Sequence, residues 1–467
     1  MSSSGSCERD GEVESEVGID KFGAPMDVTE IDAPLRSALR LTSCESMKRH
    51  INIAIESRSG DRSANQPLPR DLEDIRRLGS SAYQSTNPWS YLIRNGHEGQ
   101  RKLCIAMIEF ITEVQAHRQH EHRPLDVSGI PPLLVVYVGS SIMAAAAGRD
   151  AFPGTKFVCF DPSWKMTVPV LHRESGAYGT RIMEERVRVL KNSSGYALSA
   201  ALKWRDVAFV TDSAGKFTDE TCECVKDLLR RMPGYELAFV SDVRSPVRQT
   251  PAEKESAIAR DMADQARWVA KLGARFYSLK LRLPFEATSE IRAIYETACD
   301  SFPAGPEGRR PLDVPGLSET RVPYLSGRCV LQKFARNMST EMRLMGMEAP
   351  SVVVYDIRDI ERTFFPFNTV HRCNTRFDLV EGRRFKSSDT RAESALIARA
   401  NEHIAATVAS RDRMATFDEI GEAAVIADAA CVAAASKQPF ADAARCFDNI
   451  AFAMKSLFER RRGQVRA

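Results

Sequence analysis

The chain has 467 residues, of which 43% are hydrophobic and 27% are charged, so it can form one large domain or two ordinary domains with a buried core. Its formal net charge of +3 excludes a uniformly basic nucleic-acid-binding protein, and an RNA partner would need a local basic face. No apolar run is long enough to predict a membrane span, and the eleven scattered cysteines indicate free thiols in a reducing compartment.

The first 70 residues are expected to form a largely disordered or loosely ordered extension, because their start is rich in Ser, Gly and Glu. This acidic start lacks the apolar core of a secretory signal. A catalytic domain is expected over residues 71–384. Its first clear element is residues 98–117, where apolar side chains recur at helical spacing and predict an amphipathic helix.

Short apolar runs bounded by turns follow, with helical stretches between several of them. The predicted strands are 133–139, 156–161, 206–211, 236–242, 276–283 and 352–356, and the predicted helices between them include 218–232 and 252–273. Strands that are apolar on both faces and alternate with helices predict an α/β fold with a largely parallel, twisted sheet flanked by helices. In such sheets ligands bind beyond the carboxyl ends of the strands.

Residues 385–467 are Ala-rich and predict a helical C-terminal extension with a basic tail. This extension either packs on the core or presents a surface to a protein partner. Its tail carries Arg460, Arg461, Arg462 and Arg466.

The segment YVGSSIMAAAAG (137–148) follows a predicted strand and precedes a predicted helix. Gly139 lets the backbone approach an adenosine-type ligand, and Asp161, at the end of the next strand, is placed to accept both ribose hydroxyls. The next glycine is Gly148, so a dinucleotide-binding fingerprint is not supported. S-adenosylmethionine has no pyrophosphate and does not require that fingerprint, although a strand–glycine–helix turn also occurs without any cofactor.

Four charged residues lie in distinctive local sequences: Lys102 in GQRKLCI, Asp242 in AFVSDVRSP, Lys280 in FYSLKLRLPF and Glu341 in NMSTEMRLM. In order they spell K-D-K-E, the catalytic tetrad of enzymes that methylate the ribose 2′-hydroxyl of RNA. Three of these residues have a simpler interpretation when each is taken alone. Lys102 fits a solvated helix face, Asp242 fits a local pair with Arg244, and Lys280 fits a lysine whose head extends to water at a sheet edge.

Over residues 97–345 the chain resembles the poxvirus-type cap-specific mRNA 2′-O-ribose methyltransferase family, which is poly(A) polymerase small-subunit-like, and it is most similar to the kinetoplastid cap-4 ribose methyltransferases. The resemblance is carried, in order, by the blocks GQRK, YVGS, FDPS, RDVAFVT with KFTDE, SDVRS, SLKLRLPF, LQKFA and STEMRLM. Several blocks in the right order are far more specific than four charged residues.

The resemblance implies a Rossmann-like S-adenosylmethionine-dependent methyltransferase that acts on a cap-proximal nucleotide of mRNA or spliced-leader RNA in the nucleus, with the cytoplasm as the alternative. It implies catalytic roles for Lys102, Asp242, Lys280 and Glu341. The implied cofactor-pocket residues are Gln100, Tyr137, Gly139, Asp161, Phe217 and Asp242. The implied contacts to capped RNA are Arg282, Phe285 and Arg244. Two alternatives stay open: a methyltransferase of rRNA or tRNA without a cap, and an RNA-binding processivity subunit that has kept the fold.

The sequence departs from the family pattern at two places. Ile142-Met143 replaces a Pro-Gly pair after the first cofactor turn, and Ala287, beside Glu286, replaces the acidic residue that reads the guanine edge of the cap. The second cap-stacking aromatic is one of Tyr83, Trp89 and Tyr91. No metal site is expected, because His117, His120 and His122 fit a solvated helix end among Arg and Glu residues.

The implied chemistry explains the residue types. A ribose 2′-hydroxyl is a poor nucleophile until its proton is removed or shared. A lysine has an ordinary pKa near ~10.4 and is a poor base at neutral pH, but burial and nearby cations lower such a pKa. Lys280 is the expected base, with Lys102 orienting the oxygen. The two carboxylates are expected to hold both lysines in position.

Overall fold

The structure is a computed structural model, and it describes only part of the chain. The described residues are 18–19, 25–26, 68–78, 98–121, 131–163, 179–245, 250–300, 302, 319–335, 339–368, 372, 376–378, 394–407, 414–436 and 443–458. Most of the N-terminal extension expected to be disordered lies outside the described residues, as do the basic tail and the candidate aromatics Tyr83, Trp89 and Tyr91. Two short strands, β1 (Gly18–Ile19) and β2 (Pro25–Met26), pair with each other.

An eight-stranded sheet forms the centre of the molecule, with the order β10-β11-β8-β7-β3-β4-β6-β5. Its strands are β3 (Leu133–Val138), β4 (Lys156–Phe160), β5 (Val187–Leu190), β6 (Val207–Val210), β7 (Glu236–Ser241), β8 (Phe276–Leu281), β10 (Arg328–Val330) and β11 (Met342–Gly346). Neighbouring strands from β5 to β8 run parallel, and β11 runs antiparallel to both β8 and β10. The α/β class with a mostly parallel sheet is therefore confirmed, and it is compatible with a Rossmann-like fold.

The central strand β3 shows why the sheet is buried on both faces. All six residues of its sequence LLVVYV are buried. Leu133, Val135 and Tyr137 belong to one apolar cluster, whereas Leu134, Val136 and Val138 belong to a second cluster on the other face. A parallel strand that is covered by helices on both faces requires a continuous apolar sequence of this kind.

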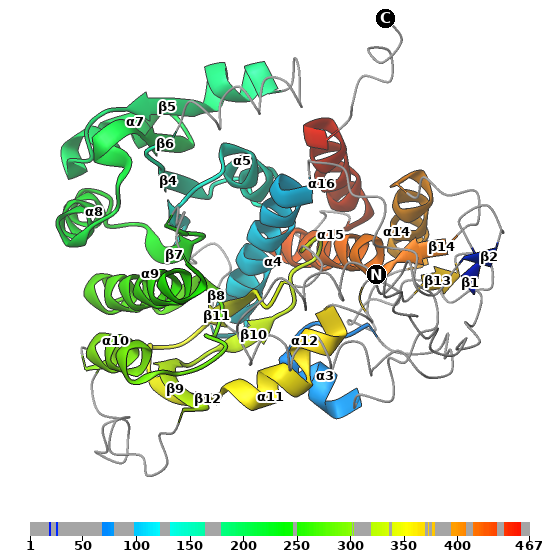
Figure 1. Ribbon diagram of the computed structural model, residues 1–467. Helices are drawn as coiled ribbons and strands as arrows, with labels where there is room; N and C mark the ends of the chain where they lie inside the picture. Colours follow the sequence, from blue (N-terminus) through cyan, green and yellow to red (C-terminus); the bar gives the residue numbers. More distant parts are fainter. Residues whose placement is uncertain are drawn as a thin grey trace, which may run out of the picture.

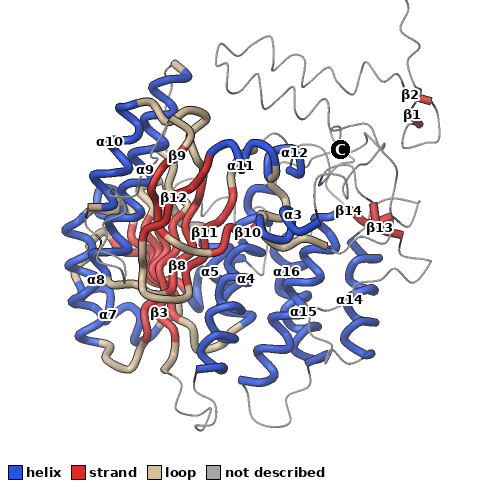
Figure 2. Tube along the Cα trace, turned by 90° about the horizontal axis from the view of Figure 1, so that it is seen from below, coloured by secondary structure: helices blue, strands red, loops and turns tan. Residues whose placement is uncertain are grey.

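Helices cover both faces of the sheet, as Figures 1 and 2 show. One side contains α4 (Glu98–Glu121) and α5 (Ile142–Ala151) next to the sheet, with α14 (Ser394–Thr407), α15 (Phe417–Ser436) and α16 (Ala443–Phe458) outside them. The other contains α7 (Gly195–Trp204), α8 (Asp219–Arg231), α9 (Pro251–Leu272) and α10 (Ser289–Cys299). The C-terminal helices α15 and α16 pack on α4 and α5 and share their apolar cluster. None of the helices in the described ranges combines the length and apolarity needed to cross a bilayer.

Local sequence signals set the limits and spacing of these helices. Thr250 and Glu253 form a reciprocal capping box at the start of α9, and Gly273, with φ +64°, ends it in the left-handed region. At Gly148 in α5, an added Cβ would lie 2.8 Å from the side chain of Ile111 in α4. The glycine therefore allows these two helices to pack closely.

The expected helices and most of the expected strands are confirmed within a few residues, but one strand prediction is wrong in its placement. Residues 352–356 form β12 (Val352–Asp356), which pairs antiparallel with β9 (Arg321–Leu325) in a separate two-stranded sheet. Its apolar run is half-exposed, with Val353 41% exposed, because the pair has only one covered face. The remaining elements are α3 (Leu72–Leu78), η4 (Asp212–Gly215), α11 (Ile357–Arg362), α12 (Phe364–Pro366), β13 (Arg376–Asp378) and β14 (Met414–Thr416).

Candidate active site at the carboxyl edge of the sheet

The ends of β3, β4 and β7 lie in register. Val138 pairs with Phe160 on one side and with Ser241 on the other, so Gly139, Asp161 and Asp242 follow at one edge. The strand order reverses around β3, and open α/β sheets bind ligands at such a switch point. The sequence prediction that these three residues lie at strand ends is confirmed.

Gly139 allows a close approach of two backbone segments. Its φ is +66°, and an added Cβ would lie 3.0 Å from the carbonyl carbon of Asp242. Its amide donates to the Phe160 carbonyl at 3.0 Å. A larger residue here would be strained and would push the end of β7 away from β3.

The four predicted catalytic residues meet at this edge as one chain of ion pairs. Lys102 Nζ lies 2.9 Å from Glu341 Oε1, and Lys280 Nζ lies 3.2 Å from Glu341 Oε2 and 3.5 Å from Asp242 Oδ1. Their side chains are only 10–16% exposed. The structure thus brings together residues that lie far apart in the sequence, and we call these four residues the charged cluster.

Strand register explains how Lys280 and Asp242 meet. Lys280 points to the opposite face from Leu279 and Leu281, which belong to the cluster under α9. Ser241 pairs with Leu279, so Asp242 follows beside Lys280. Lys280 therefore faces α4, the helix that carries Lys102.

The antiparallel direction of β11 explains the position of Glu341. Because β11 runs against β8, its first residues lie at the edge where β8 ends. Glu341 immediately precedes β11 and therefore lies beside Lys280.

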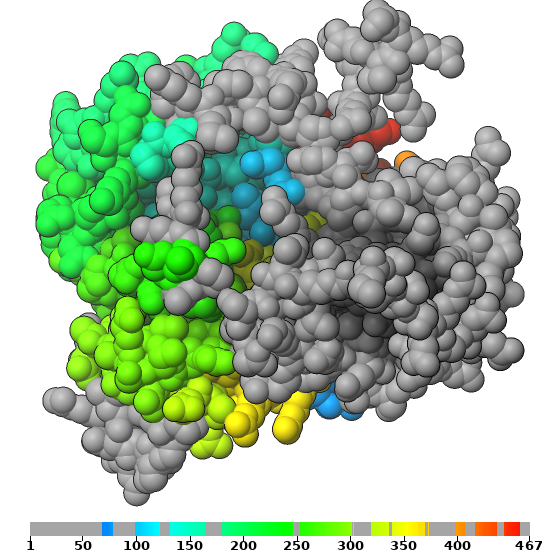
Figure 3. Space-filling model, in the orientation of Figure 1, coloured from blue at the N-terminus to red at the C-terminus, as the bar shows by residue number. Residues whose placement is uncertain are grey.

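In the space-filling view, atoms in the blue of α4 are visible at the surface beside the teal atoms that follow it in the chain, so α4 is not sealed inside the molecule (Figure 3).

The simpler interpretations of the three residues do not hold. Lys102 is not on a solvated face, because its side chain is mostly buried and paired with Glu341. Lys280 is held between two carboxylates. Asp242 contacts Lys280 and Arg343, while Arg244 Nη1 donates to the carbonyl of Val243.

Sequence reasoning missed Arg343. Its side chain is 2% exposed, and its Nη1 donates to Asp242 Oδ1 at 3.0 Å. Nη2 donates to the Ser278 carbonyl at 2.8 Å, and Nε donates to the Ser278 hydroxyl at 3.3 Å. Arg343 is directly opposite Lys280 in the ladder and fixes the carboxylate that Lys280 contacts. Its alternation with Met342 and Leu344 is the signal that could have identified it.

The electrostatic balance of the charged cluster favours an ionised Glu341. Burial raises the pKa of Glu341, but the positive charges of Lys102 and Lys280 outweigh it and hold this pKa well below its ordinary value. Beneath the charged cluster, burial raises the pKa of the Tyr137 hydroxyl well above its ordinary value, and the nearby Asp242 adds to this effect. The tyrosine therefore stays neutral, and the charge at this edge comes from the lysines, the arginines and the carboxylates.

The predicted cofactor residues divide into polar edge groups and buried rings. Gln100 Oε1 accepts a 2.6 Å hydrogen bond from Ser141 in the turn after β3. Asp161 is partly exposed and accepts from the amide and hydroxyl of Ser163. Tyr137 is 1% exposed. Phe217 is 5% exposed, and its ring packs edge-on against Phe160 and Trp268.

The predicted RNA-contact residues lie beside the charged cluster. Arg282 donates to Glu255 Oε1 at 2.5 Å, and its guanidinium lies 4.9 Å from the ring centroid of Phe285. Arg244 is different, because its Nη2 is buried without a hydrogen-bond partner among the described residues. A guanidinium nitrogen in this state is suited to an anionic or polar ligand atom.

The two departures from the family pattern have clear structural settings. Ile142 and Met143 are buried in the first turn of α5, so they serve the core. Ala287 is fully buried against the α9 layer and donates its amide to Glu319, whereas Glu286 is exposed. No acidic side chain therefore occupies position 287.

The described residues contain no group of three or more His, Cys, Asp or Glu side chains arranged to hold a metal ion. His117 contacts Glu121 at 3.2 Å, and its ring lies edge-on to Phe276. His122 lies outside the described residues.

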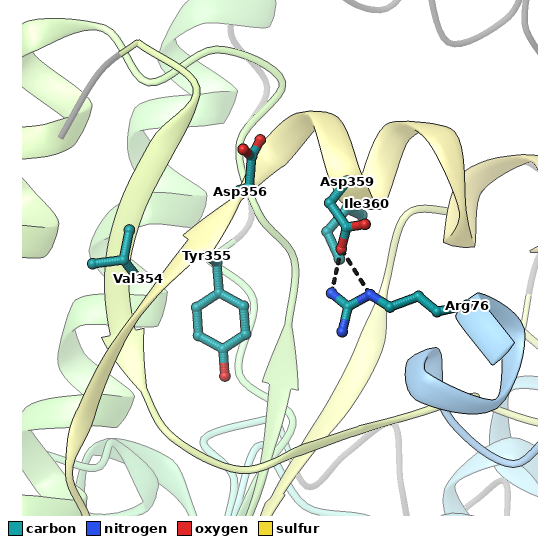
Figure 4. Close-up of a pocket in the computed structure, with 6 residues that line it drawn as sticks. All are labelled: Arg76, Val354, Tyr355, Asp356, Asp359 and Ile360. Carbon is teal, nitrogen blue, oxygen red and sulfur yellow. Dashed lines mark hydrogen bonds and ion pairs between the residues drawn. The ribbon is translucent and has the colours of Figure 1, made fainter. Parts of the chain in front are cut away.

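A separate hollow of about 350 Å³ lies between α3 and the β12–α11 corner and contains no member of the charged cluster (Figure 4). Arg76 reaches across it, and its Nε donates to Asp359 at 3.0 Å. The hollow is lined by Arg76, Val354, Tyr355, Asp356, Asp359 and Ile360. In this hollow Arg76 is already paired with Asp359. The charged cluster at the sheet edge is therefore the stronger candidate for a functional site.

No protein-family model matches the chain, and no curated protein matches its sequence. The case for a function therefore depends on the geometry of the sheet edge.

Proposed function

We propose that this protein transfers a methyl group from S-adenosylmethionine to a ribose 2′-hydroxyl of RNA, at a cap-proximal nucleotide of mRNA or spliced-leader RNA in the nucleus. The observation that carries the proposal is the charged cluster, which unites Lys102, Glu341, Lys280 and Asp242 at the switch point of a mostly parallel sheet. Charged side chains are rarely buried together without a functional or strong structural reason.

The residues at the edge fit the proposed cofactor. Gly139 has no side chain and lets the end of β7 approach the turn after β3, where the cofactor would bind. Asp161 is partly exposed at the next strand end, where its carboxylate is able to accept ribose hydroxyls. S-adenosylmethionine would supply an electrophilic methyl on a sulfonium. Gln100 and Ser141 would hold the turn between these groups in place.

The charged cluster accounts for the alcohol side of the reaction. As the new carbon–oxygen bond forms and the carbon–sulfur bond breaks, the 2′-hydroxyl proton must leave. Lys280 is the proposed acceptor, and it must first give its own proton to solvent. Asp242 and Glu341 hold its Nζ by ion pairs, and a bound sulfonium would add a positive charge beside it. The arrangement also positions the lysine, because a carboxylate after β7 and a carboxylate before β11 contact one Nζ atom.

The RNA side is supported by Arg244 and by the pair Arg282–Phe285. The Nη2 of Arg244 is buried and has no hydrogen-bond partner among the described residues, and it would donate to a phosphate or ribose oxygen that reaches it. The Phe285 ring already stacks under the Arg282 cation, and a methylated guanine is also a cation that would compete for that ring.

One observation favours a second candidate, a 2′-O-methyltransferase that acts on rRNA or tRNA without a cap. Ala287 is buried, and Arg282 covers one face of Phe285, so the expected cap-reading groups are partly absent or occupied. An RNA-binding processivity subunit without catalytic activity would not need the complete charged cluster, so the cluster favours an enzyme.

The test is transfer of tritium from labelled S-adenosylmethionine to a capped oligonucleotide and to the same oligonucleotide without its methylated guanosine. Transfer to the capped RNA alone supports the proposal, equal transfer to both favours the second candidate, and no transfer by the wild-type protein overturns both. Lys280→Met should abolish the transfer. Lys271→Met is the matched control, because Lys271 also lies between two carboxylates, Asp219 and Glu223, but on α8 and α9. Equal counts from Lys280→Met and the wild type would refute the assigned role of Lys280.

A further inference from the structure

The C-terminal helix α15 carries two buried acidic residues that face the body of the protein. Asp418 and Glu422 lie one helical turn apart, so they share a face of α15. Glu419 closes the start of this helix, where it accepts from the amide and hydroxyl of Thr416. The two acidic residues are therefore presented from a fixed helix end, and Figures 1 and 2 show α15 beside α4.

Glu422 is connected to Lys102 through the neighbouring residue Arg101. It forms an ion pair with Arg101, the residue immediately before Lys102, and it lies 3.1 Å from His403 Nε2 on α14. The guanidinium of Arg101 lies 4.4 Å from the ring centroid of Phe334, so its position is fixed on two sides. Burial raises the pKa of Glu422, but Arg101 and His403 outweigh it and hold this pKa at about 2. Glu422 is therefore a permanent negative charge at neutral pH.

Asp418 is connected to Glu341 through a series of hydrogen bonds. It accepts two hydrogen bonds from Arg372, at 2.9 and 2.7 Å, and Arg372 donates to Asn368 at 2.7 Å. Asn368 donates to the backbone carbonyl of Ser339, whose hydroxyl accepts from the amide of Glu341 at 3.2 Å. These contacts form a continuous path from α15 to the segment that holds the catalytic carboxylate.

The two paths start one turn apart on α15 and end on the two partners of a single ion pair, Lys102–Glu341 at 2.9 Å. We propose that Asp418 and Glu422 of α15 are positioning residues, which set the placement of Lys102 against Glu341 from the C-terminal extension. The consequence for catalysis rests on the proposed function, but the placement itself does not. The C-terminal helices would then be part of the active-site scaffold rather than an appendage.

The first test reads Lys102 directly and requires neither cofactor nor RNA. Trace acetylation with acetic anhydride at pH 8, quantified by mass spectrometry of the Lys102 peptide, reports how freely its amine is released from Glu341. Glu422→Gln should raise this labelling several-fold. Lys156 is the internal reference, because its side chain is similarly sequestered at 19% exposure but lies on β4, where it donates to the carbonyls of Leu202 and Arg205.

The matched control variant is Asp428→Asn. Asp428 also lies on α15 and also pairs with an arginine, Arg70, but this contact leads to the segment before α3 and not to the charged cluster. Asp428→Asn should leave Lys102 labelling unchanged. If Glu422→Gln does not fold, Asp418→Asn takes its place. This variant interrupts the path to Glu341, so it should also raise the labelling of Lys102. Unchanged Lys102 labelling in a folded variant, or an equal rise at Lys102 and Lys156, would overturn the proposal.

A double-mutant cycle on methyl transfer is the second test. Glu422→Gln alone should lower the turnover number by up to about 100-fold, the loss expected when a catalytic group moves by about 1 Å. In a Lys102→Ala background the same substitution should have little further effect, because the residue that it positions is gone. Independent, multiplying effects would contradict the positioning role. If the wild-type protein transfers no methyl at all, only the proposed function fails, and the labelling experiment still decides the placement.

Discussion

Replacing Arg343 by Met should destabilise the protein far more than the loss of an ordinary surface arginine. Arg343 is 2% exposed and makes three hydrogen bonds, one to Asp242 and two to Ser278. Met fills a similar space but leaves the Asp242 carboxylate with Lys280 at 3.5 Å as its remaining ion-pair partner. Removing one partner of a buried ion pair costs about 3–5 kcal/mol, so we expect a loss of that size in the free energy of unfolding.

The assay is urea unfolding followed by circular dichroism, with Arg275→Met as the control. Arg275 also pairs with two carboxylates, those of Glu121 and Glu236, but its side chain is 36% exposed, so its loss should cost no more than about 1 kcal/mol. Asp242→Asn combined with Arg343→Met should cost less than the sum of the single variants, because the two residues interact. If Arg343→Met is as stable as Arg275→Met, the inferred dependence of Asp242 on Arg343 is wrong.

Three further predictions concern other parts of the site. The depressed pKa of Glu422, about 2 against an ordinary 4.5, corresponds to roughly 3 kcal/mol of stability. This contribution is present above pH 4.5 and is lost as the pH falls towards 2, so the advantage of the wild type over Glu422→Gln should vanish in an acid unfolding series. Gly139→Ala should weaken the binding of S-adenosylmethionine in calorimetry by at least about tenfold, because the added Cβ would lie 3.0 Å from the backbone of Asp242 and would push apart the strand ends that form the proposed cofactor site. Gly273→Ala has nearly the same φ but open space around it, and it should leave this affinity unchanged. Glu341→Gln should lower the turnover number by about 100-fold through the misplacement of both lysines, while cofactor affinity in the same calorimetric assay stays close to that of the wild type.

Strand ends were the most predictable part of the site. Gly139, Asp161 and Asp242 each follow a buried apolar run, and runs of this kind end together in a parallel sheet. The alternation of Lys280 with Leu279 and Leu281 likewise predicts that the lysine faces away from its apolar neighbours. These features depend on local sequence and on the two-residue period of a strand.

Features that depend on long-range pairing were not predicted. The direction of β11 brings Glu341 and Arg343 to the site, yet its short sequence is equally compatible with a parallel strand. The apolar run of β12 is similar to those of the buried strands, but its partner β9 lies outside the main sheet. The contact of Glu422 with Arg101 joins residues 321 positions apart, and the contact of Asp418 with Arg372 spans 46 positions, so no local pattern reports either of them.

The antiparallel strand β11 also has a consequence for biosynthesis. Lys102 and its partner Glu341 are separated by 239 residues, so the lysine is made long before its counter-charge. At about 5–20 residues per second, a ribosome needs roughly 10–50 s to cover that interval. In the last part of this interval, after Lys280 has been added and before Glu341 follows, the growing chain carries both cluster lysines with Asp242 as the only acidic member of the cluster. The nascent domain therefore passes through a more electropositive stage, and Glu341 neutralises it only when β11 adds to the sheet.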